Sequence, residues 1–214
     1  MNVIVLDTET ANSLDDPIAY DVGWAVIDLD TRETLVTRSY AVADVFLDAE
    51  LMSSAYYAEK IPSYWDEIRN GSRTLARLAT IRKALCADCK AYGITEIYAH
   101  NARFDNRSCN TSQRYLTGSK YRYFFPYGVT ICDTLKMARL AFKQDDDYGR
   151  FCYENDYLTK RGCRRYTAEI LYRFLTGDNK FAEAHKGLDD VLIEKEILFA
   201  CIDRGITNGA LWES

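Results

Sequence analysis

The order of apolar and polar residues predicts where the first strands lie. Positions 3 to 6 are all apolar, which indicates a strand covered on both faces, and we expect it over residues 2–8. Residues 19–28 and 33–42 are rich in β-branched and aromatic side chains, and the four residues between them are typical of a turn. The pattern therefore predicts a three-stranded antiparallel meander.

After the meander, the pattern predicts alternating helices and strands. Apolar residues recur at intervals of three and four from 75 to 89, which indicates a long amphipathic helix over 74–92 that ends at Gly93. The other expected elements are a short helix at 63–69, a strand at 95–100, a helix at 104–116, a strand at 129–132, a helix at 134–142, a polar loop at 144–149, and helices at about 166–176 and 187–204, the last capped by Gly205. We therefore predict one α/β domain over residues 1–205, with a mixed five-stranded sheet flanked by helices and a C-terminal tail over 206–214.

Composition narrows the class of protein. The 214 residues are 48 % hydrophobic and 28 % charged, as in ordinary soluble globular proteins. No apolar stretch approaches the roughly 20 residues that span a bilayer, so we expect no membrane role. Apolar residues begin at position 3 without a preceding basic segment or a cleavage site, so the N-terminus predicts a structural strand and a cytoplasmic location.

The seven cysteines are odd in number and scattered, which favours reduced thiols over a disulfide framework. Cys86 and Cys89 form a CxxC inside the predicted helix, without a second such pair or paired histidines nearby. A structural zinc at this pair is therefore the less favoured alternative.

The net charge of −5 argues against a protein that grips long duplex DNA by bulk electrostatics. It is compatible with a nucleic-acid enzyme, because a site built from carboxylates is itself acidic. The most basic segment is residues 160–165, and the arginines at 69, 73, 77 and 82 recur at spacings of four or five. For these arginines we favour a solvated helix face over a nucleic-acid contact.

Two carboxylates, Asp7 and Glu9, end the first strand. Residues two apart on a strand point to the same face, about 6.6 Å apart along the backbone. Such a pair is favourable only if a cation lies between the two groups or one of them is protonated. Taken alone, the pair would fit a solvent-exposed strand end equally well.

Two later segments place further polar residues at the end of the fourth strand and at the start of the last helix. HNARFD, residues 100–105, follows the fourth strand, and ligand sites of α/β sheets lie at such carboxyl ends. If strands one and four are parallel neighbours, Asp105 lies beside Asp7 and Glu9. In AHKGLDDV, residues 184–191, His185 precedes the last helix and Asp190 lies in its first turn. In isolation this segment would also fit a surface histidine and acids favoured by the helix dipole.

These three segments together resemble a known family. DxET at Asp7 to Thr10, HNAxFD at His100 to Asp105 and HxGLxD at His185 to Asp190 are similar, in order and spacing, to the exonuclease motifs of the His-type DEDD superfamily, the DEDDh or DnaQ-like group. That group includes polymerase proofreading subunits, RNase T and oligoribonuclease. The resemblance extends from residue 3 to about residue 200, and residues 131–139 and 167–175 look like the connecting segments of these enzymes. It implies an RNase H-like fold.

The resemblance also implies roles for individual residues. Asp7, Glu9, Asp105 and Asp190 would bind two divalent cations, Mg²⁺ or Mn²⁺, and His185 would be the general base. The spacing from His185 selects Asp190 over Asp189, which we interpret as an exposed helix acid. The terminal nucleotide is expected to contact five further residues: Thr10, Ala11, Asn101, Arg103 and Phe104.

Departures from the family pattern bear on the substrate. Residues 11–12 are Ala-Asn where many relatives have glycine, and residues 106–109 are more polar than the usual apolar continuation. Both segments would line the nucleotide pocket, so the base preference stays open. Arg103, Arg107 or the 160–165 cluster could meet phosphates, and some of the 16 tyrosines could stack on bases.

The resulting hypothesis is a 3′ to 5′ exonuclease that acts on single-stranded DNA or RNA ends and releases nucleoside 5′-monophosphates. The alternatives are an RNA-specific exoribonuclease, a non-catalytic nucleic-acid-binding module that retains the fold, and an endonuclease or transposase-like enzyme. A polymerase or replication complex, or a second copy of the chain, is a conceivable partner. Catalysis of this type needs an in-line water and stabilisation of the negative charge on the phosphoryl group.

Overall fold

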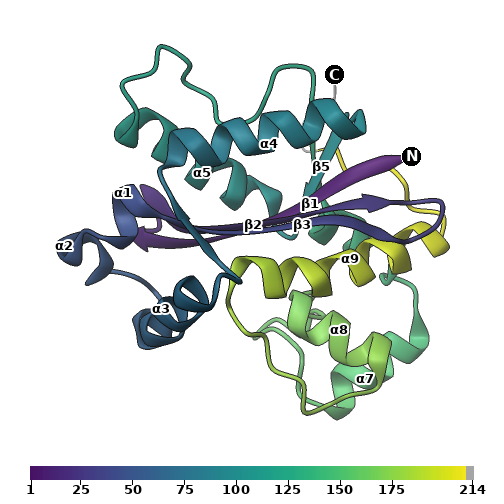
Figure 1. The fold of residues 1–214 in the computed structure, drawn as a ribbon. Helices are drawn as coiled ribbons and strands as arrows, with labels where there is room; N and C mark the ends of the chain where they lie inside the picture. Colours follow the sequence, from purple (N-terminus) through teal and green to yellow (C-terminus); the bar gives the residue numbers. More distant parts are fainter. Residues whose placement is uncertain (211–214) are drawn as a thin grey trace.

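A mixed sheet of six strands forms the centre of the computed structural model, which describes residues 1–210 (Figure 1). The strand order is β4-β3-β2-β1-β5-β6. The antiparallel pairs are β1 with β2 and β2 with β3, whereas β5 is parallel to both β1 and β6, and β4 is parallel to β3. The strands are β1 (Asn2–Asn12), β2 (Pro17–Asp28), β3 (Thr34–Val42), β4 (Thr74–Ala76), β5 (Glu96–Ala99) and β6 (Thr130–Asp133). The predicted meander and the two later strands are confirmed.

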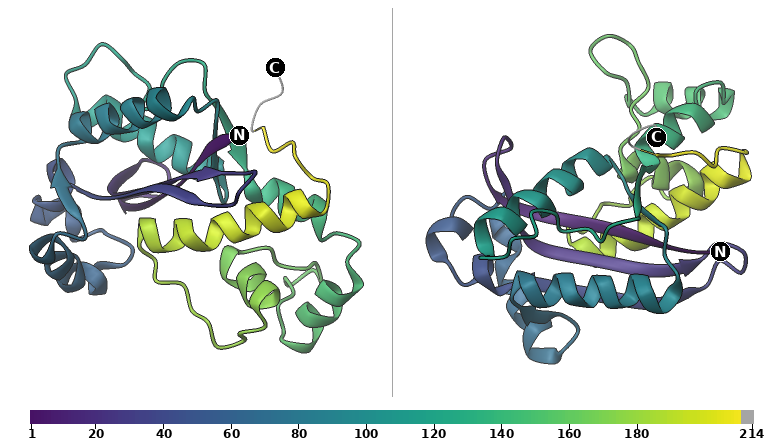
Figure 2. Two further views of the ribbon diagram at one scale, coloured as in Figure 1. Left: turned by 45° about the vertical axis from the view of Figure 1, so that its right-hand side comes forward. Right: turned by 90° about the horizontal axis from the view of Figure 1, so that it is seen from above.

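Helices cover both faces of this sheet (Figure 2). The α-helices are α1 (Ala43–Phe46), α2 (Ala49–Met52), α3 (Ile61–Asn70), α4 (Leu78–Tyr92), α5 (Ala102–Leu116), α6 (Thr134–Ala141), α7 (Asp146–Glu154), α8 (Ala168–Thr176) and α9 (Gly187–Asp203), and η1 (Ala58–Lys60) is a 3₁₀ turn. Helices α4 and α5 lie on one face, and α9 lies on the other with α8 packed against it. The sheet is therefore the middle layer of three.

Strand β1 contributes side chains to two separate cores. Ile4 and Leu6 pack with the residues of α4 and α5, whereas Val3 and Val5 pack with those of α9. All four side chains are fully buried. The alternation of a strand thus explains why this segment is apolar at every position.

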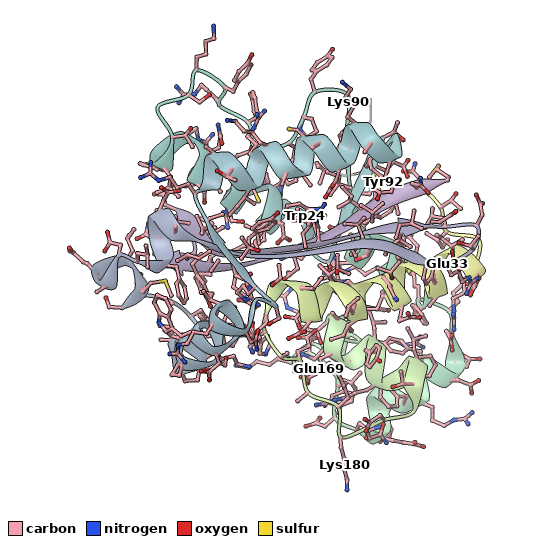
Figure 3. The ribbon with its side chains drawn as sticks, viewed as in Figure 1. Trp24, Glu33, Lys90, Tyr92, Glu169 and Lys180 are labelled. Atoms are coloured by element: carbon pink, nitrogen blue, oxygen red, sulfur yellow. The ribbon has the colours of Figure 1, made fainter. Side chains whose placement is uncertain are left out.

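One buried polar group anchors the α4 layer to the sheet. Figure 3 shows Trp24, from β2, lying between the sheet and α4. Its indole nitrogen donates a 3.0 Å hydrogen bond to Asp88 of α4, and the same carboxylate pairs with Arg38 of β3. The indole therefore buries its ring without leaving its N–H unpaired.

Two element assignments from the sequence were wrong in detail. The helix expected from residue 74 begins at Leu78, because residues 74–76 instead pair with the edge of β3 and add a sixth strand. The polar segment expected as a loop contains the start of α7, whose N-cap Asp145 accepts a hydrogen bond from the backbone of Tyr148. Acidic residues in the first turn of α7 are favoured by the helix dipole.

The segment after α9 returns to the sheet. Gly209 accepts a hydrogen bond from the backbone of Asp133, and Ala210 forms an isolated bridge with Cys132. The remainder of the predicted tail, residues 211–214, lies outside the described residues, and the division into a 1–205 domain and a tail stays a prediction. Among residues 1–210, no helix is both long enough and apolar enough to cross a membrane.

Candidate active site

The end of β1 sends its side chains to both faces of the sheet. Asp7 and Glu9 continue the alternation of Val3 and Val5, and therefore face α9. Thr8 faces the opposite side, where its hydroxyl donates a 2.8 Å hydrogen bond to Asp105 and lies 2.9 Å from the Ser108 hydroxyl. The predicted orientation of the two carboxylates toward one face agrees with this geometry.

Asp105 reaches the same place from α5. Its helix begins after Asn101, whose φ of 69° turns the chain sharply at the end of β5. The Asn101 backbone N–H donates a 3.1 Å hydrogen bond to Asp133 at the end of β6. Because β1 and β5 are parallel neighbours, the turn places the first helical residues beside the end of β1. Asp105 is 3 % exposed and is bonded to Thr8, as described above.

His185 and Asp190 come from the start of α9. His185 adopts a φ of 50°, in the left-handed region, so the chain turns sharply just before the helix. Asp190 lies in the first turn, and one carboxylate oxygen accepts a 3.0 Å hydrogen bond from the backbone of Lys186, the N-cap residue. The ligand atoms of Glu9, His185 and Asp190 all lie within 4.8 Å of one another. Asp189 is exposed, as the sequence predicted.

A buried polar network holds this loop against the sheet. Asp21 of β2 is fully buried and accepts hydrogen bonds from the Gly187 backbone at 2.9 Å and from the Tyr64 hydroxyl at 2.7 Å. Its other oxygen pairs with the buried Arg73, which also donates to Glu67 at 2.8 Å. The predicted solvated helix face is therefore wrong for Arg73, because this residue lies between α3 and β4 and neutralises a buried carboxylate.

A glycine pair makes the close approach possible. A β-carbon on Gly23 of β2 would lie 2.2 Å from the backbone nitrogen of Leu188 and 2.4 Å from the carbonyl carbon of Gly187. A β-carbon on Gly187 would in turn lie 2.8 Å from the Gly23 nitrogen. Only residues without a β-carbon allow the first turn of α9 to touch β2 in this way.

The acidic residues line one open cavity of about 430 Å³. Asp7, Glu9, Asp105 and Asp190 meet there, and two further carboxylates, Glu183 and Glu194, also line the cavity. Glu194 lies one turn after Asp190 on α9, is 3 % exposed, and accepts a 3.2 Å hydrogen bond from the backbone of His100. The cavity thus gathers side chains from β1, α5 and α9.

Burial and mutual repulsion raise the pKa values of these acids. Desolvation raises the pKa of Glu9 to about 9, with the charge of Asp190 as the next cause. Desolvation is also the main reason that the pKa values of Asp105 and Asp190 rise to about 7. The pKa of Asp7 rises through desolvation and then through the charge of Glu194. The protein alone therefore disfavours the fully ionised cluster.

The donor set fits divalent cations. Carboxylate oxygens are the ligands preferred by Mg²⁺ and Mn²⁺. The second carboxylate oxygen of Asp190 is buried without a hydrogen-bond partner, which is costly unless a further group binds it. The oxygens of Asp7, Glu9, Asp105 and Asp190 are thus suited to hold a cation, and Glu194 adds a further acidic group beside them.

The imidazole of His185 is held by an aromatic neighbour. Tyr57, which precedes η1, stacks on it with ring centroids 4.1 Å apart and an interplanar angle of 10°. Lys60 donates a hydrogen bond to the Ala184 backbone and lies 5.7 Å from the Tyr57 ring. Partial burial, and after it the charge of Lys60, lowers the pKa of His185. The ring is therefore biased toward its neutral form, which can accept a proton.

Both ring nitrogens of His100, the histidine of the HNARFD segment, have hydrogen-bond partners within the fold. Nε2 of His100 lies 2.7 Å from the carbonyl oxygen of Tyr166 and donates to it, because a carbonyl can only accept. Nδ1 lies 3.0 Å from the hydroxyl of Thr134, and burial lowers the pKa of the ring. Both nitrogens are thus engaged between β5, α6 and the segment before α8.

The structure brings together most of the predicted site. Seven of the ten predicted residues line the cavity: Asp7, Glu9, Asn101, Phe104, Asp105, His185 and Asp190. Thr10, Ala11 and Arg103 do not line it: Thr10 and Arg103 each directly adjoin a lining residue in the chain, whereas Ala11 is buried in the core on the α4 and α5 side. Arg107 donates to the Leu14 backbone, and Arg164 donates to three carbonyls around the end of α6, so both have structural partners.

Sequence reasoning missed Glu194 and Tyr57. The spacing of four between Asp190 and Glu194 places both on one helix face, and this was the available signal. Tyr57 had no comparable signal, since it lies in an irregular segment more than one hundred residues from His185. Arg139 of α6 also lines the cavity and was not predicted. Cys86 and Cys89 are on α4, where burial raises the pKa of Cys89 to about 12, and within residues 1–210 they join no cluster of metal-binding side chains.

Comparison with solved structures identifies the fold. The nuclease domain of 3′hExo, a DEDDh family member, bound to rAMP, matches 100 % of this chain and 97 % of its own, with a TM-score of 0.65 and 12 % identity. E. coli Exonuclease I in complex with a dA16 oligonucleotide matches 95 % of this chain, with a TM-score of 0.57 and 12 % identity. This chain spans only 41 % of that structure.

A third match is S. pombe Pop2p in a form that binds Mg²⁺ and Mn²⁺. It has a TM-score of 0.50 and 11 % identity, and the match covers 92 % of this chain and 81 % of that one. No family model and no curated protein sequence matches this chain. The chain therefore has the fold of DEDDh exonuclease domains, and the predicted RNase H-like architecture is confirmed.

Proposed function

We propose that the protein is a metal-dependent 3′ to 5′ exonuclease that removes nucleoside 5′-monophosphates from single-stranded DNA or RNA. The observation that carries the proposal is the convergence of five residues, separated by up to 183 positions, in one cavity: Asp7, Glu9, Asp105, His185 and Asp190. This convergence occurs in a fold shared with solved exonuclease domains.

Asp7, Glu9, Asp105 and Asp190 would hold two divalent cations, Mg²⁺ or Mn²⁺. Such cations stabilise the charge that develops on the phosphoryl group and lower the pKa of a bound water. The chain contributes four carboxylates whose mutual repulsion is relieved when cations bind, and it orients Asp105 through Thr8 and Asp190 through the Lys186 backbone. These contacts preorganise the site before substrate arrives.

His185 accepts the proton of the attacking water. Its lowered pKa keeps the imidazole neutral at pH 7, as a general base requires. Tyr57 fixes the plane of the ring, and the Asp21 network fixes the loop that carries it. The base is therefore held on one side of the carboxylate cluster.

The substrate enters as a strand end. Asn101 and Phe104 line the cavity and contact the terminal nucleotide, and Thr10 and Arg103 directly adjoin lining residues in the chain. Both the sugar preference and the base preference depend on these contacts, and rates measured on DNA and on RNA assign the preferred substrate. An RNA-specific enzyme would show a requirement for the 2′-hydroxyl.

A panel of labelled substrates tests the proposal. Single-stranded DNA, single-stranded RNA, duplexes and mismatched 3′ ends are each labelled at the 5′ end and incubated with Mg²⁺ or Mn²⁺. We expect a ladder that shortens from the 3′ end and releases mononucleotides. Asp190→Asn should abolish the ladder, whereas Asp189→Asn, the same change at the exposed neighbour, should leave it intact.

Other results would select the alternatives. Binding of single strands without metal-stimulated turnover would indicate a non-catalytic module, and cleavage of a circular single strand would indicate an endonuclease. Full activity of Asp190→Asn would contradict the proposed site. Association with a polymerase complex or a second copy of the chain can be measured by sedimentation once the substrate is known.

A further inference from the structure

A second hollow lies on the α4 and α5 side of the sheet. We call it the tyrosine groove: a volume of about 740 Å³ between α4, α5 and the loop that joins α5 to β6. Its lining includes Arg82 of α4, Asn106 and Asn110 of α5, and Tyr121, Tyr123 and Tyr127 of the loop. The loop and these two helices lie on the same side of the sheet (Figure 1). The proposed exonuclease chemistry does not use this groove.

The loop is fixed in place, although its tyrosines are exposed. Phe124 is fully buried, and its backbone N–H donates a 2.8 Å hydrogen bond to Asn110. Gln113 donates to the backbone of Tyr121 at 3.0 Å, and Arg82 donates to the backbone of Tyr123 at 3.1 Å. These bonds hold the backbone while leaving the aromatic rings beside it free to contact a ligand.

Three large aromatic side chains are thereby left in water. Tyr121 is 63 % exposed, Tyr123 is 70 % exposed and Tyr127 is fully exposed. Ordered, exposed rings around a concave surface are typical of sites where nucleobases stack, because every base presents a π face. All three rings come from one stretch of seven residues and line the same groove.

The charge of the groove suits a polyanion. Its lining residues include two arginines, Arg82 and Arg122, and no aspartate or glutamate. The whole chain, in contrast, has a net charge of −5. The Arg82 guanidinium lies 5.5 Å from the centre of the Tyr121 ring, so a cationic group lies beside an aromatic one. Phosphates and bases are complementary to this arrangement.

The groove and the candidate active site are lined by neighbouring residues of α5. Asn106 lines the groove and directly follows Asp105, which lines the acidic cavity. Asn110 lies five residues beyond Asp105, or about 8 Å along the helix axis. A strand whose 3′ end occupies the acidic cavity can therefore continue over the start of α5 into the groove.

We propose that the tyrosine groove binds the bases of single-stranded nucleic acid on the 5′ side of the nucleotide that is removed. The polarity of this path rests on the proposed exonuclease function, whereas binding of a single strand in the groove does not. The groove makes the protein selective for strands of several nucleotides over very short ones. The phosphates of the strand contact Arg82 and Arg122.

The double variant Tyr123→Ala, Tyr127→Ala tests the groove without touching the acidic cavity. Both side chains are exposed, so their loss should leave the fold intact. The matched control is Tyr153→Ala, because Tyr153 is 77 % exposed on α7, across the sheet from the groove. Affinity for a 5′-fluorescein single strand is measured by anisotropy in EDTA, which reads binding without turnover.

For a strand of about 20 nucleotides, we expect the double variant to bind at least about tenfold more weakly than the wild type. The control should bind like the wild type. In the presence of Mg²⁺, the KM for the long strand should rise in the double variant, while kcat/KM for a trinucleotide stays unchanged. Equal affinity of wild type and double variant for the long strand would overturn the proposal.

The two proposals fail in different ways. If the wild type binds the long strand through these tyrosines but releases no mononucleotide with either metal, the exonuclease function fails and the groove stands. If the wild type degrades the long strand and the double variant does so with the same KM, the groove fails and the exonuclease function stands.

Discussion

At the residue scale, the surroundings of His185 decide whether its imidazole can act. No carboxylate hydrogen-bonds to the ring at short range, since Nδ1 of His185 lies 3.9 Å from the nearest carboxylate oxygen of Glu183. Instead, the flat stack with Tyr57 fixes the ring plane, and the left-handed backbone of His185 aims it. Tyr57 is therefore a positioning residue for the proposed base.

The stack predicts a difference between two substitutions. Tyr57→Phe keeps the ring and should retain nearly full activity, whereas Tyr57→Ala should lower kcat by about tenfold to a hundredfold, because small misplacement of a reacting group is costly. The KM should change little in either variant. Steady-state kinetics on one labelled single strand measure both parameters, and equal kcat values for the two variants would contradict the role.

Glu194 shows how one buried carboxylate adds to the repulsion in the cavity. Desolvation and, after it, the charge of Asp105 raise its pKa well above the usual range. Glutamine in its place can still accept the hydrogen bond from the His100 backbone, but it carries no charge. This substitution therefore separates the charge of Glu194 from its contact.

We predict that Glu194→Gln stabilises the protein in EDTA at pH 8 by at least about 1 kcal/mol, since one pKa unit corresponds to about 1.4 kcal/mol. The increase in melting temperature caused by Mn²⁺ should become smaller, because less repulsion is left to relieve. Glu196→Gln, an exposed change on the same helix, is the control. Chemical unfolding with and without Mn²⁺ measures both effects, and a less stable Glu194→Gln variant in EDTA would be contrary evidence.

At the scale of elements, the site depends on how closely α9 approaches β2. The first turn of α9 carries Asp190, and the residue before its N-cap is His185. Gly23 and Gly187 let the two backbones touch. The buried Asp21, which pairs with Arg73, lies at this contact and accepts a hydrogen bond from the Gly187 backbone. Breaking such a buried pair typically costs about 3–5 kcal/mol, because one charge is left without its partner.

Gly23→Ala tests this approach directly. The new methyl group would overlap the backbone of Leu188, and the helix start must move. We expect a loss of about 1–3 kcal/mol in stability, as for other overpacked cores, together with a large loss of kcat. Gly118→Ala is the matched control, since its β-carbon meets nothing within 4 Å. Thermal unfolding and turnover are measured for both variants, and an unaffected Gly23→Ala protein would refute the role of this contact.

At the scale of the whole molecule, the fold concentrates negative charge at the carboxyl ends of the central strands. The carboxyl ends of β1 and β5 meet there, and helices from both faces add acids to the same place. Folding thus brings like charges together that are far apart in the unfolded chain. This cluster opposes folding, and cations that bind only the folded state should stabilise it.

The raised pKa values predict how stability depends on pH without metal. A carboxyl whose pKa is higher in the folded state binds its proton more tightly there, so its contribution is present at low pH and is lost as the pH rises. Since the pKa of Glu9 rises from 4.5 to about 9 and those of Asp105 and Asp190 from 3.8 to about 7, the melting temperature in EDTA should fall between about pH 5 and pH 9.

Divalent cations should reverse this loss. We expect Mn²⁺ or Mg²⁺ to raise the melting temperature more at pH 8 than at pH 5, because more of the carboxylates are ionised at pH 8. Asp7→Asn should remove much of the effect, because one of the four carboxylates that would hold the cations loses its charge. Scanning fluorimetry at both pH values provides the measurement. A melting temperature indifferent to both metals would argue against the cation site.

Local pattern was sufficient for much of the fold. The apolar run at the start of β1 and the turn after β2 identified the meander, because burial of one or both faces of a strand determines which of its residues are apolar. The helix start at residue 74 was wrong, since the pairing of residues 74–76 with β3 is a long-range interaction that local periodicity does not record. The start of α7 was missed because its capping acids look like loop residues.

The sequence by itself supplied the acidic residues and the histidine proposed for the site, because three short segments resemble the DEDDh motifs and such a resemblance depends on residue order alone. Only the tertiary structure decided that these segments share one cavity, that Glu194 and Tyr57 join them, and that Arg73 is buried beneath the loop. The physical reason is that such contacts join residues distant in the chain, and their free energy depends on packing between elements rather than on the order of residues within any one of them.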